Sequence, residues 1–225
     1  MLPLPFLNGV FVFITVLCLW LLYRASGRNK QVLFVSVAWL TLQGLISITG
    51  FYQDYSVLPP KFLLAVVPAL AFVLLIFILP SGKKFISSLD PAWLTYLHAV
   101  RIPVEVTLVM LWLEGMVPRE MTFEGMNYDI LAGLSAPFIS WFGYVKKSIS
   151  RTGLILWNAV CLALLINIVV TAVLSAPFPF QKFGMEQPNV AVFYYPFIWL
   201  PAFIVPVVLF SHLALLKRLF RPNPS

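Results

Sequence analysis

Three ionisable side chains lie inside one long apolar stretch, residues 92–114: His98, Arg101 and Glu105. Their spacing of three and then four residues places all three on one face of a helix. An ionisable group inside a bilayer costs about 2.5–3.5 kcal/mol on insertion scales, so such groups normally face the protein interior and pair there. We therefore expect this face to point inward, with Arg101 and Glu105 paired near the middle of the membrane.

Two amides, Gln43 and Asn167, lie at a comparable depth in other apolar stretches. Counting along each helix at 1.5 Å per residue places both in one polar layer with Glu105. Polar groups at mid-membrane are typical of a buried site for a small polar or amphipathic molecule, and here Arg101 would complete that site. The alternative is an interhelical latch, in which the same four side chains bind one another and fix the packing.

His98 and His212 also lie at similar depths, each a few residues from the inner end of its helix. Two histidines at equal depth could hold a haem or a transition metal between two helices, with Cys18 as the candidate third ligand. A histidine that is hydrogen-bonded beside Arg101 or Ser211 explains the pattern more simply. We therefore predict no cofactor, and His98 and His212 stay secondary metal candidates.

Residues 118–129 gather three acids, an arginine, a threonine and an asparagine. Pairs of carboxylates can do acid–base chemistry or bind a hard cation such as calcium. An enzyme acting here would use Glu114, Glu124 and Asp129, with Asn127 beside them. The alternative is structural: Asn127 and Asp129 cap the next helix, against its N-terminal dipole, and the remaining acids are solvated.

Seven apolar segments position these residues, and each is close to the ~20 residues that a bilayer-crossing helix needs. The segments run near residues 6–23, 32–51, 62–80, 92–114, 128–145, 153–175 and 193–216. The composition agrees, with 61% hydrophobic residues, 10% charged residues and a mean hydropathy of +0.94. We predict an all-α integral membrane protein, a single seven-transmembrane-helix bundle that comprises residues 1–225.

Prolines punctuate the predicted helices. Asp90 precedes Pro91, a pair typical of an N-cap followed by the first helical position, so the fourth helix should begin there. Pro103 lies inside the fourth predicted span and cannot donate to the carbonyl four residues earlier, so we expect a kink there. Further prolines should break the third, fifth and seventh spans in the same way: Pro68, Pro137, Pro196, Pro201 and Pro206. Such breaks are tolerated where a neighbouring helix satisfies the freed carbonyl.

Basic residues mark the predicted cytoplasmic side of the bundle. Eleven of the 15 lysines and arginines follow the first, third, fifth and seventh segments: Arg24, Arg28, Lys30, Lys83, Lys84, Lys146, Lys147, Arg151, Lys217, Arg218 and Arg221. Six of the eight acids lie on the opposite side: Asp54, Glu114, Glu120, Glu124, Asp129 and Glu186. The N-terminus is therefore predicted outside and the C-terminus in the cytoplasm. Residues 1–5 lack a basic segment and no cleavage site follows, so we expect the first span to be retained.

The net charge of +7 lies in short clusters beside the membrane, where anionic lipid headgroups are nearer partners than nucleic acid.

The sequence lacks the residues that several classes of membrane protein require. The last span, 193–216, contains no lysine that could hold retinal, and two histidines are too few for a three-histidine zinc site. The Gly-x-Ser-x-Gly and His-Glu-x-x-His patterns are also absent from the sequence.

These observations favour a membrane protein that binds, and in one version transports, a small polar or amphipathic molecule in a mid-membrane cavity. A membrane enzyme acting on a lipid or lipid-linked substrate at the outer face is the first alternative. A non-catalytic subunit of a larger membrane complex is the second. The expected location is a bacterial plasma membrane, crossed several times by the chain.

Overall fold

The computed structural model describes residues 4–55 and 57–220, and all regular elements in that part of the chain are helices. Five helices are long and apolar enough to cross a membrane, or six if one bent pair counts as a span. The five are α1 (Leu4–Ala25), α2 (Lys30–Ile48), the run of α5 (Pro91–Leu97), η2 (His98–Val100) and α6 (Arg101–Leu113), α8 (Arg151–Leu174), and the run of η6 (Leu200–Ile204) and α9 (Val205–Leu219). This architecture is consistent with a helical membrane protein.

The other two predicted segments are shorter helices in the structure. The third contains α3 (Leu63–Ile78), which is followed after a bend of 88° by α4 (Pro80–Ser88). The fifth contains α7 (Ile130–Ile139) and the π-helical η4 (Ser140–Val145). Three single 3₁₀ turns complete the described part: η1 (Phe51–Gln53), η3 (Arg119–Met121) and η5 (Ala191–Phe193). The number of crossings and the side on which each end lies stay predictions.

The bend between α3 and α4 follows from three consecutive features of the sequence. Leu79 is extended, at φ −71° and ψ 142°, as residues before a proline usually are. Pro80 then occupies the first turn of α4, where its missing N–H costs nothing. A Cβ atom on Gly82 would collide with the backbone carbonyl of Ile76, so only glycine allows the two helices to turn so tightly. The predicted span 62–80 therefore ends at Ile78.

The predicted start of the fourth helix is confirmed. The carboxylate of Asp90 accepts hydrogen bonds from the backbone N–H groups of Ala92 and Trp93, at 2.8 and 3.3 Å, and Pro91 is the first residue of α5. The side chain of Asn29 caps α2 in the same way. The predicted cap at Asp129 is wrong, because its side chain makes no such bond to α7.

The predicted proline breaks are confirmed only in part. Pro68 lies inside α3 and Pro137 inside α7, and both helices continue past the proline. Two other prolines have a structural counterpart. Pro103 leaves the carbonyl of Ala99 without its helical donor, and Ala99 lies in the 3₁₀ turn η2, where the helix tightens. Pro206 leaves the carbonyl of Ala202 free, and the indole Nε1 of Trp39 on α2 donates to that oxygen at 2.9 Å. A neighbouring helix thus satisfies the carbonyl that the proline releases, as expected.

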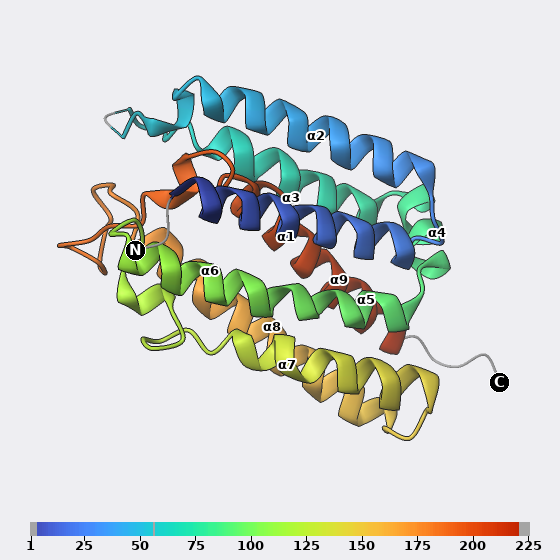
Figure 1. Cartoon of the computed structure of the whole chain (residues 1–225). Coiled ribbons are helices and arrows are strands. Elements are labelled where there is room, and N and C mark those ends of the chain that lie inside the picture. The colour runs from blue at the N-terminus through green and yellow to red at the C-terminus, as the bar shows by residue number, and fades with distance from the viewer. Residues whose placement is uncertain (1–3, 56, 221–225) are drawn as a thin grey trace.

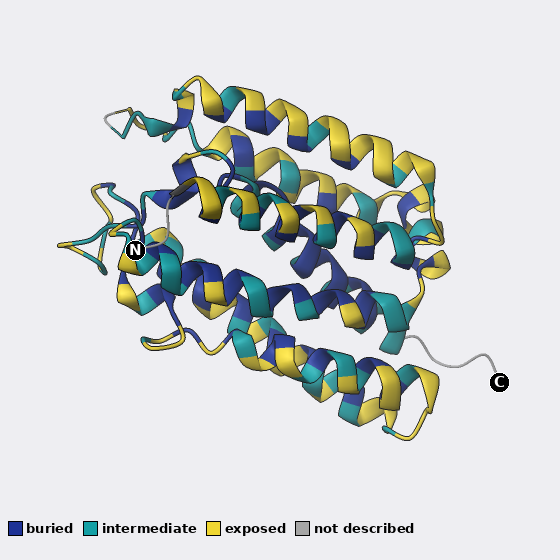
Figure 2. Ribbon diagram, in the orientation of Figure 1, coloured by how far each residue is buried: buried dark blue, intermediate teal, exposed yellow. Residues whose placement is uncertain are grey.

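The long helices run side by side, with α5–α6 and α9 inside the bundle and α2 at its edge (Figure 1). About 61% of the residues in the apolar windows of Pro91–Leu113 and Leu200–Leu219 are buried, against 28% for α2 and for α8. Figure 2 shows the same contrast between the dark α5–α6 run and the exposed outer face of α2. The polar residues of the α5–α6 run therefore lie where they are shielded from lipid.

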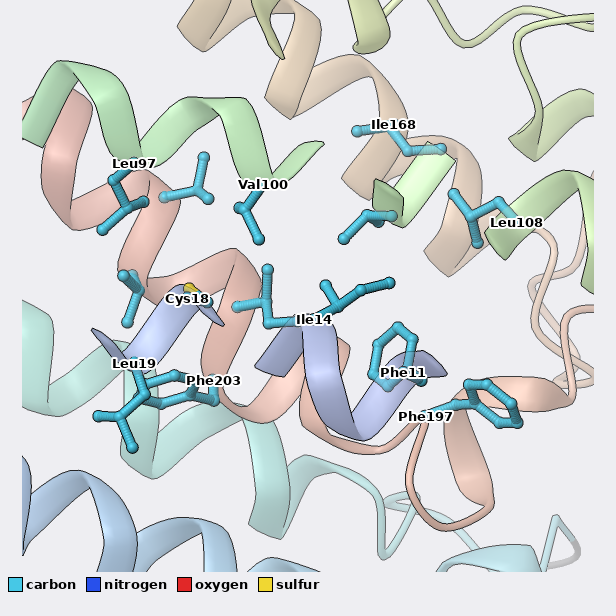
Figure 3. Packing of buried hydrophobic residues seen from close by; sticks show 14 of the residues in the cluster. Phe11, Ile14, Cys18, Leu19, Leu97, Val100, Leu108, Ile168, Phe197 and Phe203 are labelled. Carbon is cyan, nitrogen blue, oxygen red and sulfur yellow. The ribbon is translucent and has the colours of Figure 1, made fainter. Parts of the chain in front are cut away.

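Apolar side chains from α1 interlock with α5–α6, α8 and η6 at the centre of the bundle (Figure 3). Phe11, Ile14 and Cys18 recur every three or four residues and form the buried face of α1. The ring of Phe11 meets that of Phe197 edge to face, with centroids 5.1 Å apart. Because lipid tails are as apolar as these side chains, close packing rather than exclusion of water stabilises the contact.

The segments rich in basic residues collect at one end of the bundle. The α1–α2 turn, α4, the η4–α8 turn and the end of α9 all lie at this end, and the longer segments 49–62, 114–129 and 175–199 lie at the other (Figure 1). Arg221, which belongs to the last predicted basic cluster, lies outside the described residues. This separation of charge is the one that the predicted orientation requires.

Candidate functional site

Arg101 lies buried at the start of α6, where α7 comes close to the α5–α6 run. Its guanidinium forms a bidentate salt bridge with Asp129, with Nε 2.5 Å from Oδ2 and Nη2 paired with Oδ1. The Nη1 group contacts Nε2 of His212 at 3.2 Å, and Nη2 also donates to the backbone carbonyl of Cys161 at 3.2 Å. Only 3% of Arg101 is exposed. Its partner is thus Asp129, and the expected pair with Glu105 is not the one formed.

Glycine 133 explains how α7 approaches so closely. A Cβ atom at Gly133 would lie 2.8 Å from Cγ1 of Ile102, 3.0 Å from the backbone nitrogen of Ile102 and 3.3 Å from Cβ of Arg101. These distances are too short for a relaxed contact with the neighbouring helix. The absence of a side chain on Gly133 therefore brings Asp129, four residues earlier, within reach of Arg101.

Asn127 links Glu105 to the same cluster. Its Nδ2 donates to both carboxylate oxygens of Glu105, at 2.7 and 2.6 Å, and to the carbonyl of Met121 at 3.0 Å. Its Oδ1 accepts from the backbone N–H of Asp129 at 3.0 Å. The segment before α7 thus folds into the bundle, and Asp129 is only 5% exposed. The interpretation of Asp129 as a helix cap is wrong, because the carboxylate binds the buried arginine instead.

The two histidines meet, as their equal depth permits. The rings of His98 and His212 stack with centroids 3.8 Å apart and planes inclined by 21°. Nδ1 of His212 contacts Oδ1 of Asn158 at 3.0 Å, and its Nε2 faces Arg101, so both of its ring nitrogens are engaged. Neither ring nitrogen of His98 has a hydrogen-bond partner among the described residues. Stacked rings present their faces to each other and do not aim two nitrogens at one point, as bis-histidine ligation requires.

The candidate third ligand lies elsewhere. Cys18 packs in the apolar core of α1, among Phe11 and Ile14 (Figure 3). Within residues 4–55 and 57–220, no group of three or more His, Cys, Asp or Glu side chains could hold a metal ion.

Gln43 and Asn167 do not join Arg101 and Glu105. Oε1 of Gln43 accepts from the hydroxyl of Tyr52 at 2.6 Å, in a buried pair that joins α2 to η1. Burial also raises the pKa of Tyr52, which keeps its hydroxyl protonated as the donor. The amide of Asn167 is exposed and donates to the carbonyl of Met126 at 2.9 Å. The four residues lie at comparable positions along their helices, but their side chains point in different directions.

The three acids predicted for catalysis lie in different surroundings. Asp129 is buried against Arg101, Glu114 follows the last residue of α6 and is partly exposed, and Glu124 is exposed in the segment after η3. No hydrogen bond joins any two of them in the described part of the chain.

A cavity of about 340 Å³ lies between α3, α6, α8 and the η6–α9 run. Its walls are mainly aliphatic, with Leu63 and Leu70 from α3, Leu165 and Val169 from α8, and Ile204 from η6. Its volume is within the range of ~300–1,000 Å³ that small-molecule pockets usually have. Four polar side chains also line it: Arg101, Glu105, Asp129 and Asn189. The surface of the cavity is thus almost wholly apolar, and the buried charged cluster lies directly behind one of its walls.

Three residues of this region received no separate role from the sequence: Asn158, Asn189 and Gly133. Asn158 lies inside an apolar span, so the sequence marks it as a polar residue within a helix as clearly as it marks Asn167. Asn189 lies in the segment between α8 and η5, which has no regular structure at this position, and only its burial, at 1% exposure, distinguishes it. Nothing in the spacing of Gly133 distinguishes it from other glycines in membrane helices.

One protein family covers most of this chain. The family described as a domain of unknown function, DUF8737, matches residues 57–220, which is well over half of the chain. The chain belongs to this family. No curated protein and no solved structure matches it. Every residue that lines the cavity lies between Pro60 and Leu209, inside the family's range, whereas α1 and α2 precede that range. The walls of the cavity are therefore built entirely from the part of the chain that the family covers.

Proposed function

We propose that this protein binds an amphipathic, lipid-like molecule in the cavity between α3, α6, α8 and the η6–α9 run. The apolar part of the ligand lies along the aliphatic walls, and its polar part faces Glu105 and the Arg101–Asp129 pair. One observation carries this proposal: three charged side chains line a cavity that is otherwise almost wholly apolar. Charged groups are costly in such surroundings, and a ligand that binds them offsets that cost.

The hydrogen bonds of the cluster also fit the latch interpretation, since Asn127 and Arg101 join α6 to residues 127–129 and to α9. A latch alone needs no space beside it, because packed side chains would shield its charges fully. Here Arg101, Glu105 and Asp129 lie along one wall of a cavity, although each of them is buried. In this proposal the cluster fixes the helices, and side-chain movement on binding brings its polar groups into contact with the ligand.

The prolines of the neighbouring η6–α9 run favour transport of the ligand over binding alone. The π-helical η6 contains Pro201, and α9 contains Pro206, and both prolines line the cavity. Broken helices beside a mid-membrane site are typical of transporters, where they let one part of the bundle move against another. In this proposal, movement at η6 opens the cavity and releases the ligand.

The proposed setting is a bundle that crosses a bacterial plasma membrane seven times, with α3–α4 and α7–η4 completing the set of crossings. The N-terminus lies outside and the C-terminus inside. The end of the bundle that carries the basic segments then contacts anionic headgroups of the cytoplasmic leaflet. In this proposal the ligand enters the cavity from the lipid, between α3 and α8.

Two alanines on α8 give a direct test. Ala172 lines the cavity, whereas Ala163 is exposed, and their separation of nine positions amounts to about two and a half helical turns. We expect native mass spectra of the gently purified protein to show a retained small molecule. Ala172→Trp fills the cavity and should remove that molecule, whereas Ala163→Trp, the matched control, should retain it. Equal retention in both variants would reject the cavity as the binding site.

A further inference from the structure

A groove of about 480 Å³ lies between α1, α5 and η4, and it shares no lining residue with the cavity of the proposed function. Its floor is one face of the α5–α6 run, where Ala92, Tyr96, Ala99 and Pro103 recur at spacings of four, three and four residues. The small side chains of the two alanines leave the space between α1 and η4 unfilled.

The length of the groove matches one leaflet of a bilayer. The eleven positions from Ala92 to Pro103 rise by about 16 Å along a helix, which is about half of the ~30 Å thickness of the hydrocarbon core. Ala92 lies in the first turn of α5, at the basic end of the bundle. The groove therefore extends from the basic end to about the middle of the membrane, as one acyl chain of that leaflet does.

Two tryptophans hold Arg24 at the basic end of the groove. Trp20 of α1 and Trp93 of α5 both line the groove, and their rings meet edge to face with centroids 5.8 Å apart. The guanidinium of Arg24, one turn after Trp20, lies 4.4 Å from the ring centroid of Trp93 and 5.4 Å from that of Trp20. Such cation–π contacts engage the face of the guanidinium and leave the N–H donors at its edge free.

The guanidinium of Arg24 has no anionic partner among the described residues. Neither salt bridge in that part of the chain includes Arg24, and its side chain donates no hydrogen bond there. Asp90, the acid that precedes α5, accepts from the backbone N–H groups of that helix instead. Arg28 and Lys30, in the turn after α1 and at the start of α2, add further positive charge. This site thus favours an anion from outside the chain.

We propose that the groove binds an anionic phospholipid from the leaflet at the basic end of the bundle. The phosphate accepts hydrogen bonds from Arg24, and one acyl chain lies along the face from Ala92 to Pro103. These groups are accessible from the bilayer, since Trp20 is 44% exposed and Tyr96 is 41% exposed. A lipid satisfies both parts of the site, whereas a free phosphate ion would leave the apolar groove unfilled.

The bound lipid also joins α1 to the rest of the bundle. One wall of the groove consists of Leu17, Trp20 and Leu21 from α1, which precedes the range that the family covers. The floor and the other wall come from α5 and η4, which lie inside that range. The acyl chain therefore contacts helices on both sides of the family boundary.

Two lipids with identical acyl chains test this inference: phosphatidylglycerol, which is anionic, and phosphatidylcholine, which is zwitterionic. Both carry a phosphate, so they differ in net charge. Native mass spectra of the full chain, titrated with each lipid in mild detergent, give the dissociation constants. We expect phosphatidylglycerol to bind at least about tenfold more tightly. Arg24→Gln should bring the two lipids to within about twofold, whereas Lys30→Gln, which removes the same charge from an exposed position nearby, should keep the preference.

Two cavity-filling variants separate the groove from the other cavity. Ala99→Phe fills the groove and should weaken the binding of both lipids at least about tenfold, and Ala172→Trp should leave the binding of phosphatidylglycerol unchanged. The proposal fails if Ala172→Trp blocks this lipid and Ala99→Phe does not, and the proposed function then stands alone.

The lipid preference itself decides between a specific site and general attraction to a basic surface. Equal binding of the two lipids by the unaltered protein would overturn the proposal, and this measurement requires no variant to fold. An equal loss of the preference in Arg24→Gln and Lys30→Gln would also overturn it, because any cation at the basic end would then serve as well as Arg24.

Discussion

Arg101 and Asp129 depend on each other for their places inside the bundle. Removal of the carboxylate leaves a buried guanidinium without a counter-ion, which costs about 3–5 kcal/mol in buried ion pairs. We expect Asp129→Ala to lower the free energy of unfolding by about this amount, measured by unfolding in mixed micelles with a denaturing detergent. The double variant Arg101→Met with Asp129→Leu removes both charges and should recover most of the loss.

The salt bridge between Lys61 and Asp54 provides the control for this prediction. Its N–O distance is 2.8 Å, but the side chains are 33% and 36% exposed, so solvent screens the pair. Lys61→Met should change the free energy of unfolding by less than about 1 kcal/mol. If Asp129→Ala is no more destabilising than Lys61→Met, the buried pair with Arg101 does not form in the protein.

The polar residues inside the predicted spans show which contacts the sequence alone can predict. The three-then-four spacing correctly placed His98, Arg101 and Glu105 on one buried face, and depth counting correctly allowed His98 and His212 to meet. The partner of Arg101 was predicted wrongly, because the segment before α7 folds inward and Asp129 displaces Glu105 from that role. Depth alone also grouped Gln43 with Glu105. The periodicity of a helix does not show which of its faces meets another helix.

Close contact between α7 and the α5–α6 run depends on one glycine. Gly133→Ala introduces a Cβ atom 2.8 Å from Cγ1 and 3.0 Å from the backbone nitrogen of Ile102. The helices must then separate, which weakens the Arg101–Asp129 contact as well. We expect the free energy of unfolding to fall by about 1–3 kcal/mol, the usual cost of overpacking. Denaturing-detergent titration of the purified protein checks this value.

Gly9 is the matched control on another helix. Nothing lies within 4 Å of a Cβ atom built at Gly9 of α1. Gly9→Ala should therefore leave the stability unchanged or raise it by up to about 1 kcal/mol, since alanine favours helix more than glycine. Destabilisation by Gly9→Ala equal to that of Gly133→Ala would show that the loss reflects glycine replacement in general rather than the α7 contact.

The sequence predicts the helices more completely than it predicts the contacts between them. Each predicted apolar segment contains a helix, and the Asp90–Pro91 signal marks the first residue of α5. Hydropathy ended the third segment at residue 80, close to the end of α3 at Ile78, but it did not show that the chain turns there by 88° into α4. The bend depends on the extended Leu79 and on Gly82, and neither changes the hydropathy profile.

For the whole molecule, the predicted orientation places the basic end of the bundle in the cytoplasm, and labelling of single cysteines in intact cells tests it. Both native cysteines, Cys18 and Cys161, are buried, so they should give little background with a membrane-impermeant maleimide. Glu124→Cys lies at the end with the longer segments and should label in intact cells, whereas Lys84→Cys and Lys146→Cys lie at the basic end and should label only after permeabilisation. The reverse pattern would show that the basic end of the bundle lies outside the cell. Labelling of Lys84→Cys from outside, with Lys146→Cys protected, would instead show that α3–α4 does not cross as one span and would reduce the number of crossings.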